Sequence, residues 1–198
     1  MANNKRFGIA CANSLLSVVL ATTVAFASPH DQKLPHDVGE WFKQATPSDK
    51  KAILAHPKLL AEAQLYLVSC QFQTGADAVR ACHNNQMQFV EDYIDAFYNH
   101  HTAQQNVAFD LDGEGGNTMP FPGVQVSHLQ GCAWRLAIVG SGGPLVSQMD
   151  TTGIHDVCSP LSHLDQLAAE RRAQEIDREI LVHLSNGSSP ITNADSFP

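Results

Sequence analysis

The stretch that most restricts the fold of this chain is GVQVSHLQGCAWRLAIVGSG, residues 123–142. Apolar and small residues recur in it at spacings of three and four, which is the period of an α-helix that buries one face. Ser127 suits the N-cap, and the glycines that follow Val139 suit the C-terminal end. We therefore predict a buried or half-buried helix over 127–139, in which the small Gly131 lets another helix approach closely. Its apolar stripe consists of Val126, Leu129, Ala133, Leu136, Ala137 and Gly140, with Trp134 and Ile138 beside it.

This stretch also resembles the second half of a Sel1-like repeat, which is a helical hairpin related to the tetratricopeptide repeat. Ser127 departs from the pattern, because the repeat has an acidic residue there. Residues 103–108 resemble the first helix of the repeat, so the resemblance implies one degenerate unit at about 103–142. Residues 98–162 also resemble small exported bacterial proteins with a CAWR segment. The positions that match the repeat are Gly123, Val124, Gly131, Trp134 and Gly142.

The N-terminus has the features of a secretory signal peptide. Lys5 and Arg6 precede an apolar run over 14–26, which is too short to span a membrane, and an Ala-x-Ala site ends at Ala27. Removal of residues 1–27 leaves 171 of the 198 residues and, because Lys5 and Arg6 are lost, 10 basic against 20 acidic side chains, a formal charge of −10. We therefore expect a periplasmic or secreted protein with no membrane span after cleavage. The acidic balance argues against nucleic acid as a partner.

Four cysteines remain in the mature chain, and an even number in an exported protein predicts two disulfides. Three pairings are possible. We favour Cys70–Cys82 and Cys132–Cys158, because the members of each pair are close in sequence and flank a turn that contains glycine.

The remainder of the chain predicts further helices and no convincing strand. We expect a loosely ordered segment over 28–40, a helical domain over 41–185 and a disordered tail over 186–198. The fold class is all-α, built of packed helical hairpins of the Sel1-like type and held by disulfides. The expected helices cover 46–56, 57–73, 76–99, 102–111, a short piece after Met149, and 162–184, and the clearest loop covers 112–123.

Trp134 and Arg135 are the best candidates for a binding site. Tryptophan and arginine dominate the energetics of many protein interfaces, so the pair could line a groove for a peptide. The alternative is structural, with Trp134 in the core and Arg135 paired with a carboxylate on a neighbouring helix. The sequence favours the structural role.

Ten histidines raise the possibility of a metal site. His128 and Cys132 are four residues apart and share a helix face, but an oxidised Cys132 cannot bind a metal. Asp110, Asp112 and Glu114 alternate as in a calcium loop, yet Phe121 occupies the twelfth position, where that loop needs glutamate. The candidate metal ligands are His83, His100, His101 and His128.

No spacing in the chain matches a known catalytic motif, and no cofactor is expected. As the resemblance implies, the first hypothesis is a non-enzymatic binding or scaffold protein of the cell envelope, whose partner is a protein or peptide. The alternatives are a periplasmic metal-binding protein that uses histidines, and an enzyme with an unrecognised site. The sequence leaves the oligomeric state open.

Overall fold

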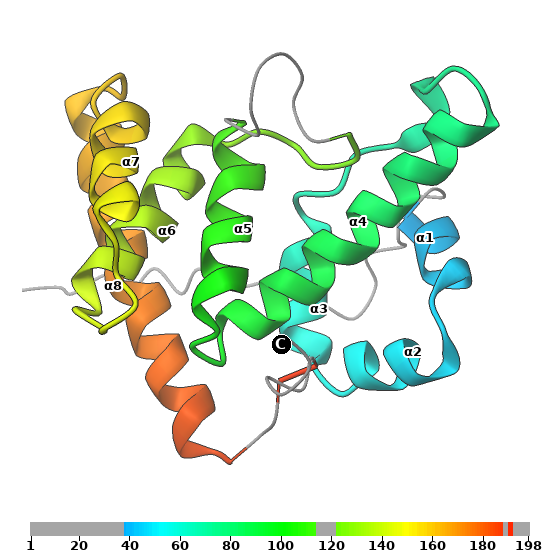
Figure 1. Ribbon diagram of the computed structural model, residues 1–198, viewed down its shortest axis with the longest axis horizontal. Coiled ribbons are helices and arrows are strands. Elements are labelled where there is room, and N and C mark those ends of the chain that lie inside the picture. The colour runs from blue at the N-terminus through cyan, green and yellow to red at the C-terminus, as the bar shows by residue number, and fades with distance from the viewer. Residues whose placement is uncertain (1–37, 114–121, 188–189, 192–198) are drawn as a thin grey trace, which may run out of the picture. The chain divides into compact units, whose positions relative to one another are not determined.

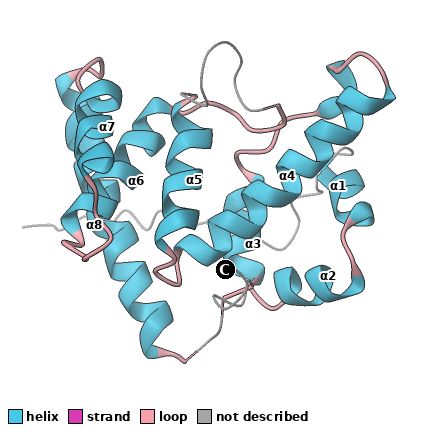
Figure 2. Cartoon of the chain, viewed as in Figure 1, coloured by secondary structure: helices cyan, strands magenta, loops and turns pink. Residues whose placement is uncertain are grey.

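The computed structural model describes residues 38–113, 122–187 and 190–191. The predicted signal peptide, the segment 28–37, most of the loop predicted over 112–123 and the end of the tail lie outside the described residues. The described residues form eight α-helices and one short 3₁₀ helix, so the all-α class is confirmed (Figure 2). None of these helices combines the length and the apolar character that a membrane crossing requires.

The helices follow one another with short connections over most of the chain. Their bounds are α1 Val38–Gln44, α2 Pro47–Leu54, α3 Pro57–Gln64, η2 Cys70–Phe72, α4 Ala76–Ala96, α5 His101–Asp112, α6 His128–Gly140, α7 Gln148–Cys158 and α8 His163–Ser185.

Helix α4 occupies the centre of the arrangement (Figure 1). Helices α1, α2 and α3 pack along it, and α5 packs on it from another side. Helix α6 then packs on α5, α7 and α8, so it lies among three helices. Helices α5 and α6 form the hairpin of the predicted Sel1-like unit, while the repeat type itself stays a prediction.

Several helix starts follow from capping residues in the sequence. Thr46 and Asp49 form a capping box at α2, and Pro47 occupies the first turn, where its missing N–H is not needed. Ser162 caps α8 by accepting a hydrogen bond from the backbone N–H of Asp165. Ser147 and Asp150 form a second capping box, which begins α7 close to the short helix expected there.

The helix predicted over 57–73 is wrong beyond Gln64, where α3 ends. The chain instead pairs with the segment before α6: the N–H of Val68 donates to the carbonyl of Gly123 at 3.0 Å, and the N–H of Gln125 donates to the carbonyl of Tyr66 at 2.7 Å. These bonds frame an isolated antiparallel bridge between Leu67 and Val124. Pairing with a distant segment therefore overrides the local helical pattern.

Ordered contacts continue beyond both predicted bounds of the helical domain, 41 and 185. Helix α1 begins at Val38, before the boundary predicted at Trp41. Ile191, within the tail predicted to be disordered, packs against the core, and its N–H donates to the carboxylate of Asp95 at 2.6 Å. An apolar side chain and a backbone hydrogen bond thus hold Ile191 against the core.

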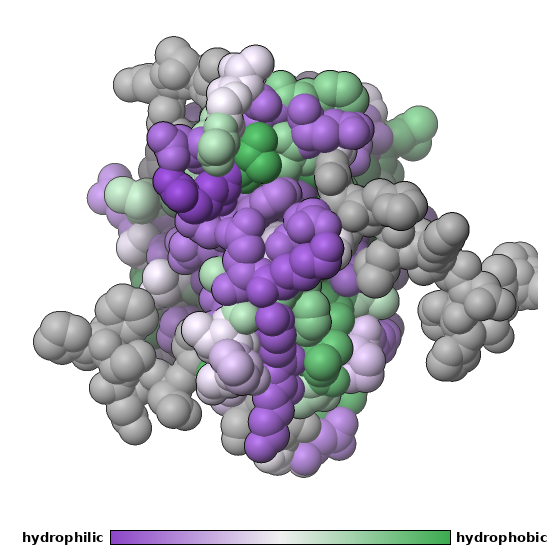
Figure 3. All heavy atoms as spheres, turned by 90° about the vertical axis from the view of Figure 1, so that its right-hand side faces the viewer, coloured by the Kyte–Doolittle hydropathy of each residue, from purple (hydrophilic) through white to green (hydrophobic). Residues whose placement is uncertain are grey.

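The core contains a chain of aromatic rings that runs from α4 to α6. The ring of Trp134 lies 5.1 Å from that of Phe97 and 6.1 Å from that of Tyr93, both edge-on. Phe89 continues the series at 5.8 Å from Tyr93. On the side that carries α1 and α2, hydrophilic side chains run down the centre of the surface, with smaller apolar patches beside them (Figure 3).

Candidate functional site

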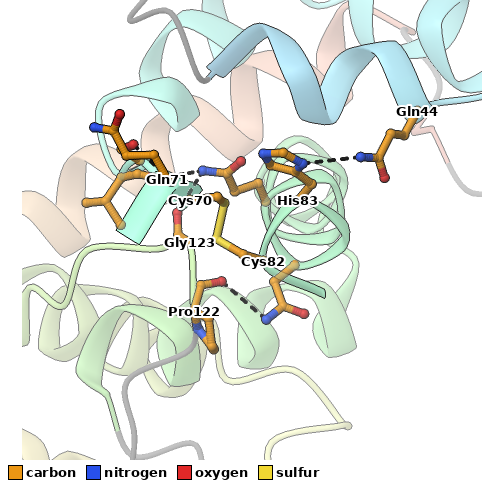
Figure 4. Close-up of a disulfide and its surroundings, with 11 residues drawn as sticks. Gln44, Cys70, Gln71, Cys82, His83, Pro122 and Gly123 are labelled. Atoms are coloured by element: carbon orange, nitrogen blue, oxygen red, sulfur yellow. Dashed lines mark hydrogen bonds between the residues drawn. A yellow bond between two sulfur atoms is a disulfide. The ribbon is translucent and has the colours of Figure 1, made fainter. Parts of the chain in front are cut away.

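Both predicted disulfides are confirmed: Cys70–Cys82 and Cys132–Cys158 are bonded. The first joins the 3₁₀ helix to α4, and Gly123 lies beside it (Figure 4). A Cβ atom at Gly123 would lie 2.8 Å from the carbonyl oxygen of Cys82, so only glycine fits there without a shift. The second disulfide ties α6 to α7.

Trp134 and Arg135 lie in the interior, with exposed fractions of 1% and 5%. They therefore cannot line a surface groove, and their proposed role as direct binding residues is wrong. Trp134 is a core anchor. Arg135 donates from Nε to the carboxylate of Asp112 on α5 at 2.8 Å, which is the structural role that the sequence favoured.

The Arg135–Asp112 ion pair is enclosed by backbone. A Cβ atom at Gly153 of α7 would lie 2.8 Å from Cζ of Arg135, and one at Gly131 would lie 2.6 Å from Cβ of Asp112. The two glycines thus allow α5, α6 and α7 to close around a buried charge pair. Because a buried charge is stable only when it is paired, this pair fixes the relative positions of three helices.

The four candidate metal-ligating histidines do not converge. His83 is buried against α1, where Nε2 of Gln44 donates to its Nδ1 at 3.2 Å (Figure 4). His100 and His101 begin α5, and Nε2 of His101 lies 3.6 Å from a carboxylate oxygen of Asp150. His128 begins α6, and its neighbour Cys132 is oxidised. Within the described ranges no three His, Cys, Asp or Glu side chains are placed to hold a metal ion.

The most distinctive polar site is a cleft between α4 and α5, with a volume of about 270 Å³. Asp92 of α4 and Asp110 of α5 both line it. Nδ2 of Asn106 donates to a carboxylate oxygen of Asp92 at 3.1 Å. No basic side chain is among the described residues that line the cleft, which are Gln88, Asp92, Asn106, Phe109 and Asp110.

The carboxylates of this cleft have raised pKa values. Burial raises the pKa of Asp110 to about 7, and the charges of Asp92 and Asp112 add to the effect. Burial also raises the pKa of Asp92 to about 6, although hydrogen bonds from Asn106 and Gln88 oppose it. Beside the cleft, burial and the charges of Asp49, Asp92 and Asp95 raise the pKa of Glu91 to about 7. Burial and the neighbouring carboxylates thus disfavour the charged forms of Asp92 and Asp110, and no basic side chain lines the described part of the cleft.

Arg135 supports this cleft from behind. Its guanidinium carbon lies 4.8 Å from the ring centroid of Phe109, and that ring lines the cleft. Arg135, one of the two candidate binding residues, thus contacts the ring that forms a wall of the cleft.

Asp92 was not singled out from the sequence, and Asp110 was considered only as part of a calcium loop. The predicted helix ended at Leu111 and left Asp112 in a loop, whereas α5 extends to Asp112. The usable signal was helical spacing: Gln88 and Asp92 share a face of α4, as Asn106 and Asp110 share a face of α5. That signal cannot show that the two faces meet.

A second, smaller cavity of about 190 Å³ lies at the start of α6. His128 and Asp156 line it together with Asp112, Val157, Pro160 and Leu161. Because Asp112 already binds Arg135, this cavity has less uncompensated charge than the α4–α5 cleft.

Comparisons of the chain with known protein families, with curated proteins and with solved structures find no match. The fold and the cleft define an all-helical, disulfide-bonded domain with an acidic site between two central helices.

Proposed function

We propose that the protein is a non-enzymatic binding protein of the cell envelope, exported to the periplasm or secreted, whose α4–α5 cleft receives a cationic side chain of a protein or peptide partner. The observation that carries the proposal is the presence of two half-buried carboxylates, Asp92 and Asp110, in one cleft whose described lining has no basic side chain. The two disulfides and the predicted signal peptide support export.

The chemistry of the cleft suits a guanidinium or ammonium group. Two carboxylates close together in a partly desolvated site repel each other, which favours protonation over a double negative charge. A bound cation would replace that proton and make charge-assisted hydrogen bonds. Arginine fits best, because its planar fork can donate to Asp110 and Asp92 while the amide oxygens of Gln88 and Asn106 accept other N–H groups.

The size of the cleft favours a single side chain of a partner as the ligand, rather than a whole small molecule. Its volume of about 270 Å³ lies below the roughly 300–1,000 Å³ typical of sites that enclose a small ligand. The formal charge of −10 expected after signal removal would also speed the approach of a basic partner.

The test uses two short peptides that differ in one side chain: Ala-Arg-Ala, and the same peptide with citrulline, which has the shape of arginine without its charge. We expect the arginine peptide to shift the side-chain amide signals of Asn106 in NMR spectra and to release protons in calorimetry, because Asp110 is about half protonated at neutral pH. The citrulline peptide should do neither. Binding should also weaken as the pH falls below about 6, since both carboxylates then carry protons.

Substitutions of single carboxylates test whether the arginine peptide binds in the α4–α5 cleft. Asp110→Asn should weaken binding of the arginine peptide at least about tenfold, equivalent to about 1.4 kcal/mol. The matched control is Asp77→Asn, because Asp77 is an exposed carboxylate on α4 that pairs with Arg80 outside the cleft. Equal binding of both peptides, or equal effects of the two variants, would contradict the proposal.

The raised pKa of Asp110 also favours a second candidate, an enzyme in which this carboxylic acid donates a proton at neutral pH. Two carboxylates that flank a bond are the machinery of glycoside hydrolysis. Cleavage of a soluble oligosaccharide panel that is lost in both Asp92→Asn and Asp110→Asn would support the enzyme. Peptide binding without any cleavage would support the binding protein.

A further inference from the structure

An asparagine followed by a glycine, Asn186-Gly187, comes directly after α8. Asn186 is the C-cap residue, and its N–H donates to the carbonyls of Val182 and His183 at 3.2 and 3.3 Å. Gly187 has a φ of 65°, the left-handed conformation in which glycine commonly follows the end of a helix. Both residues are exposed. The helix therefore ends on a solvent-accessible side-chain amide that is followed by a residue without a Cβ atom.

The backbone nitrogen of Gly187 is available for attack on this amide. Among the described residues, the N–H of Gly187 donates no hydrogen bond, and the side-chain amide of Asn186 has no partner either. The last turn of α8 is held through N–H groups up to that of Asn186, so rotation about the Cα–C bond of Asn186 breaks none of these bonds. Such a rotation brings the nitrogen of Gly187 to Cγ of Asn186, and glycine offers the least steric obstruction to that approach.

The other described asparagines lack this combination, and none of them precedes a glycine. Asn99 is followed by His100, whose N–H donates to a backbone carbonyl at 3.4 Å. Three more lie inside α4 and α5, where the N–H of the next residue is held by the helix: Asn84, Asn85 and Asn106. Within the described residues, the reactive arrangement is therefore specific to Asn186.

We propose that Asn186 is a site of spontaneous deamidation, with water as the co-reactant. The nitrogen of Gly187 forms a bond to Cγ of Asn186, the bond from Cγ to Nδ2 breaks, and the proton of the Gly187 N–H leaves with the amide nitrogen as ammonia. Water then opens the succinimide ring. Cleavage between the ring nitrogen and Cγ gives aspartate, and cleavage between the ring nitrogen and the backbone carbonyl carbon gives isoaspartate. No atom is oxidised or reduced.

The modification loosens the attachment of the C-terminal segment to the core. Ile191 lies five residues after Asn186, its side chain packs against the core, and its N–H donates to a carboxylate oxygen of Asp95 at 2.6 Å. A new carboxylate at the C-terminal end of α8 interacts unfavourably with the helix dipole. Isoaspartate also inserts the Cβ atom into the backbone between α8 and Ile191. Both changes disturb the connection that places Ile191 on Asp95.

The first test is peptide mapping by mass spectrometry of the full mature chain after incubation at neutral pH. We expect the peptide that contains Asn186 to gain the mass difference between an amide and a carboxyl group, and the product to separate into aspartate and isoaspartate forms. In Gly187→Ala the reaction should be at least about tenfold slower, equivalent to about 1.4 kcal/mol in the barrier, because the added methyl group obstructs the attack. Helical circular dichroism verifies that this variant folds. An unchanged Asn186, a rate no faster than at Asn99, or equal rates in the two chains would overturn the proposal.

The second test measures the consequence for the C-terminal segment. The control is Asn186→Gln, because glutamine cannot form the five-membered ring with the next backbone nitrogen. After the same incubation, we expect the amide hydrogen of Ile191 to exchange severalfold faster in the deamidated wild-type chain than in this variant. Equal exchange would show that the segment stays attached after deamidation, and would overturn the proposed loosening.

Discussion

At the scale of single residues, Gly131 is a position where the fold tolerates little change. A Cβ atom there would lie 2.6 Å from Cβ of Asp112 and 2.9 Å from its backbone nitrogen. We expect Gly131→Ala to lower the free energy of unfolding by about 1–3 kcal/mol, because the backbone of α5 has to move away from α6. Urea denaturation followed by circular dichroism measures the loss.

Gly140 of the same helix is the control for this prediction. The nearest atom to a Cβ at Gly140 is a carboxylate oxygen of Asp177 at 3.7 Å, an ordinary contact. Gly140→Ala should therefore leave stability unchanged or raise it by up to about 1 kcal/mol through helix propensity. If both alanines cost the same, close approach of α5 and α6 is not what Gly131 provides.

Arg135 is the second residue whose replacement should be costly. Arg135→Leu would leave the carboxylate of Asp112 buried without the guanidinium, and breaking a buried pair in this way costs about 3–5 kcal/mol. Arg80→Leu removes an arginine from an exposed pair with Asp77 and should cost at most about 1 kcal/mol. Chemical denaturation of the two variants under the same conditions makes the comparison. Similar losses would mean that the Arg135–Asp112 pair is not effectively buried.

At the scale of elements, the sequence predicts a helix well where its signals are local. The caps Thr46 and Ser162 mark the starts of α2 and α8, and the apolar period marks α6. The helix predicted over 57–73 was wrong at residues 65–73, because Leu67 pairs with Val124, which is distant in the sequence. The cleft was missed for the same reason: Asp92 and Asp110 become neighbours only when α4 packs on α5. Similarly, the sequence favoured a carboxylate partner for Arg135 on a neighbouring helix, but it could not identify that partner as Asp112.

The C-terminal end of α8 meets the start of α3 and the end of α4 through a cluster of rings. The hydroxyl of Tyr98 lies 3.0 Å from Nδ1 of His56, and the ring of His183 lies 5.2 Å from that of Tyr98. Burial lowers the pKa of His56, and the charge of His183 lowers it further, while Asp95 opposes them. The cluster therefore favours the neutral form of His56.

We expect the pKa of His56 to rise in His183→Asn, because the like charge is gone. Histidine titration by NMR measures it, and His155→Asn, at an exposed site on α7, should leave it unchanged. The sign for stability follows from proton binding. The pKa of His56 is lowered on folding. The contribution of His56 to the free energy of unfolding is therefore present above the ordinary pKa of 6.5, and it is lost as the pH falls through the lower pKa of the folded state. An unchanged pKa in His183→Asn would contradict this contact.

At the scale of the whole molecule, three carboxyl groups with raised pKa values lie where α4 and α5 pack. Glu91, Asp92 and Asp110 are partly buried on α4 and α5, and no salt bridge links any of them to another described residue. Such an arrangement costs stability in the free protein. A partner that supplies a cation would remove this cost, so binding and stability are linked through the same carboxylates.

This linkage predicts the pH dependence of stability. The pKa values of Asp92 and Asp110 are about 6 and about 7 in the folded chain, against 3.8 for an ordinary aspartate. Between about pH 4 and 7 the folded state therefore binds more protons than the unfolded state, and the contribution of these groups to stability is lost as pH rises through that window.

His56 acts in the opposite direction, so the test must be a difference between variants. The free energy of unfolding of Asp110→Asn minus that of the wild type should increase as the pH rises from 4 to 7. Above pH 7 this difference should stay constant. In Asp156→Asn, where the carboxylate is exposed, the difference from wild type should stay nearly constant. A constant difference for Asp110→Asn as well would mean that Asp110 is solvated, and the cleft would then lack the uncompensated charge on which cation binding depends.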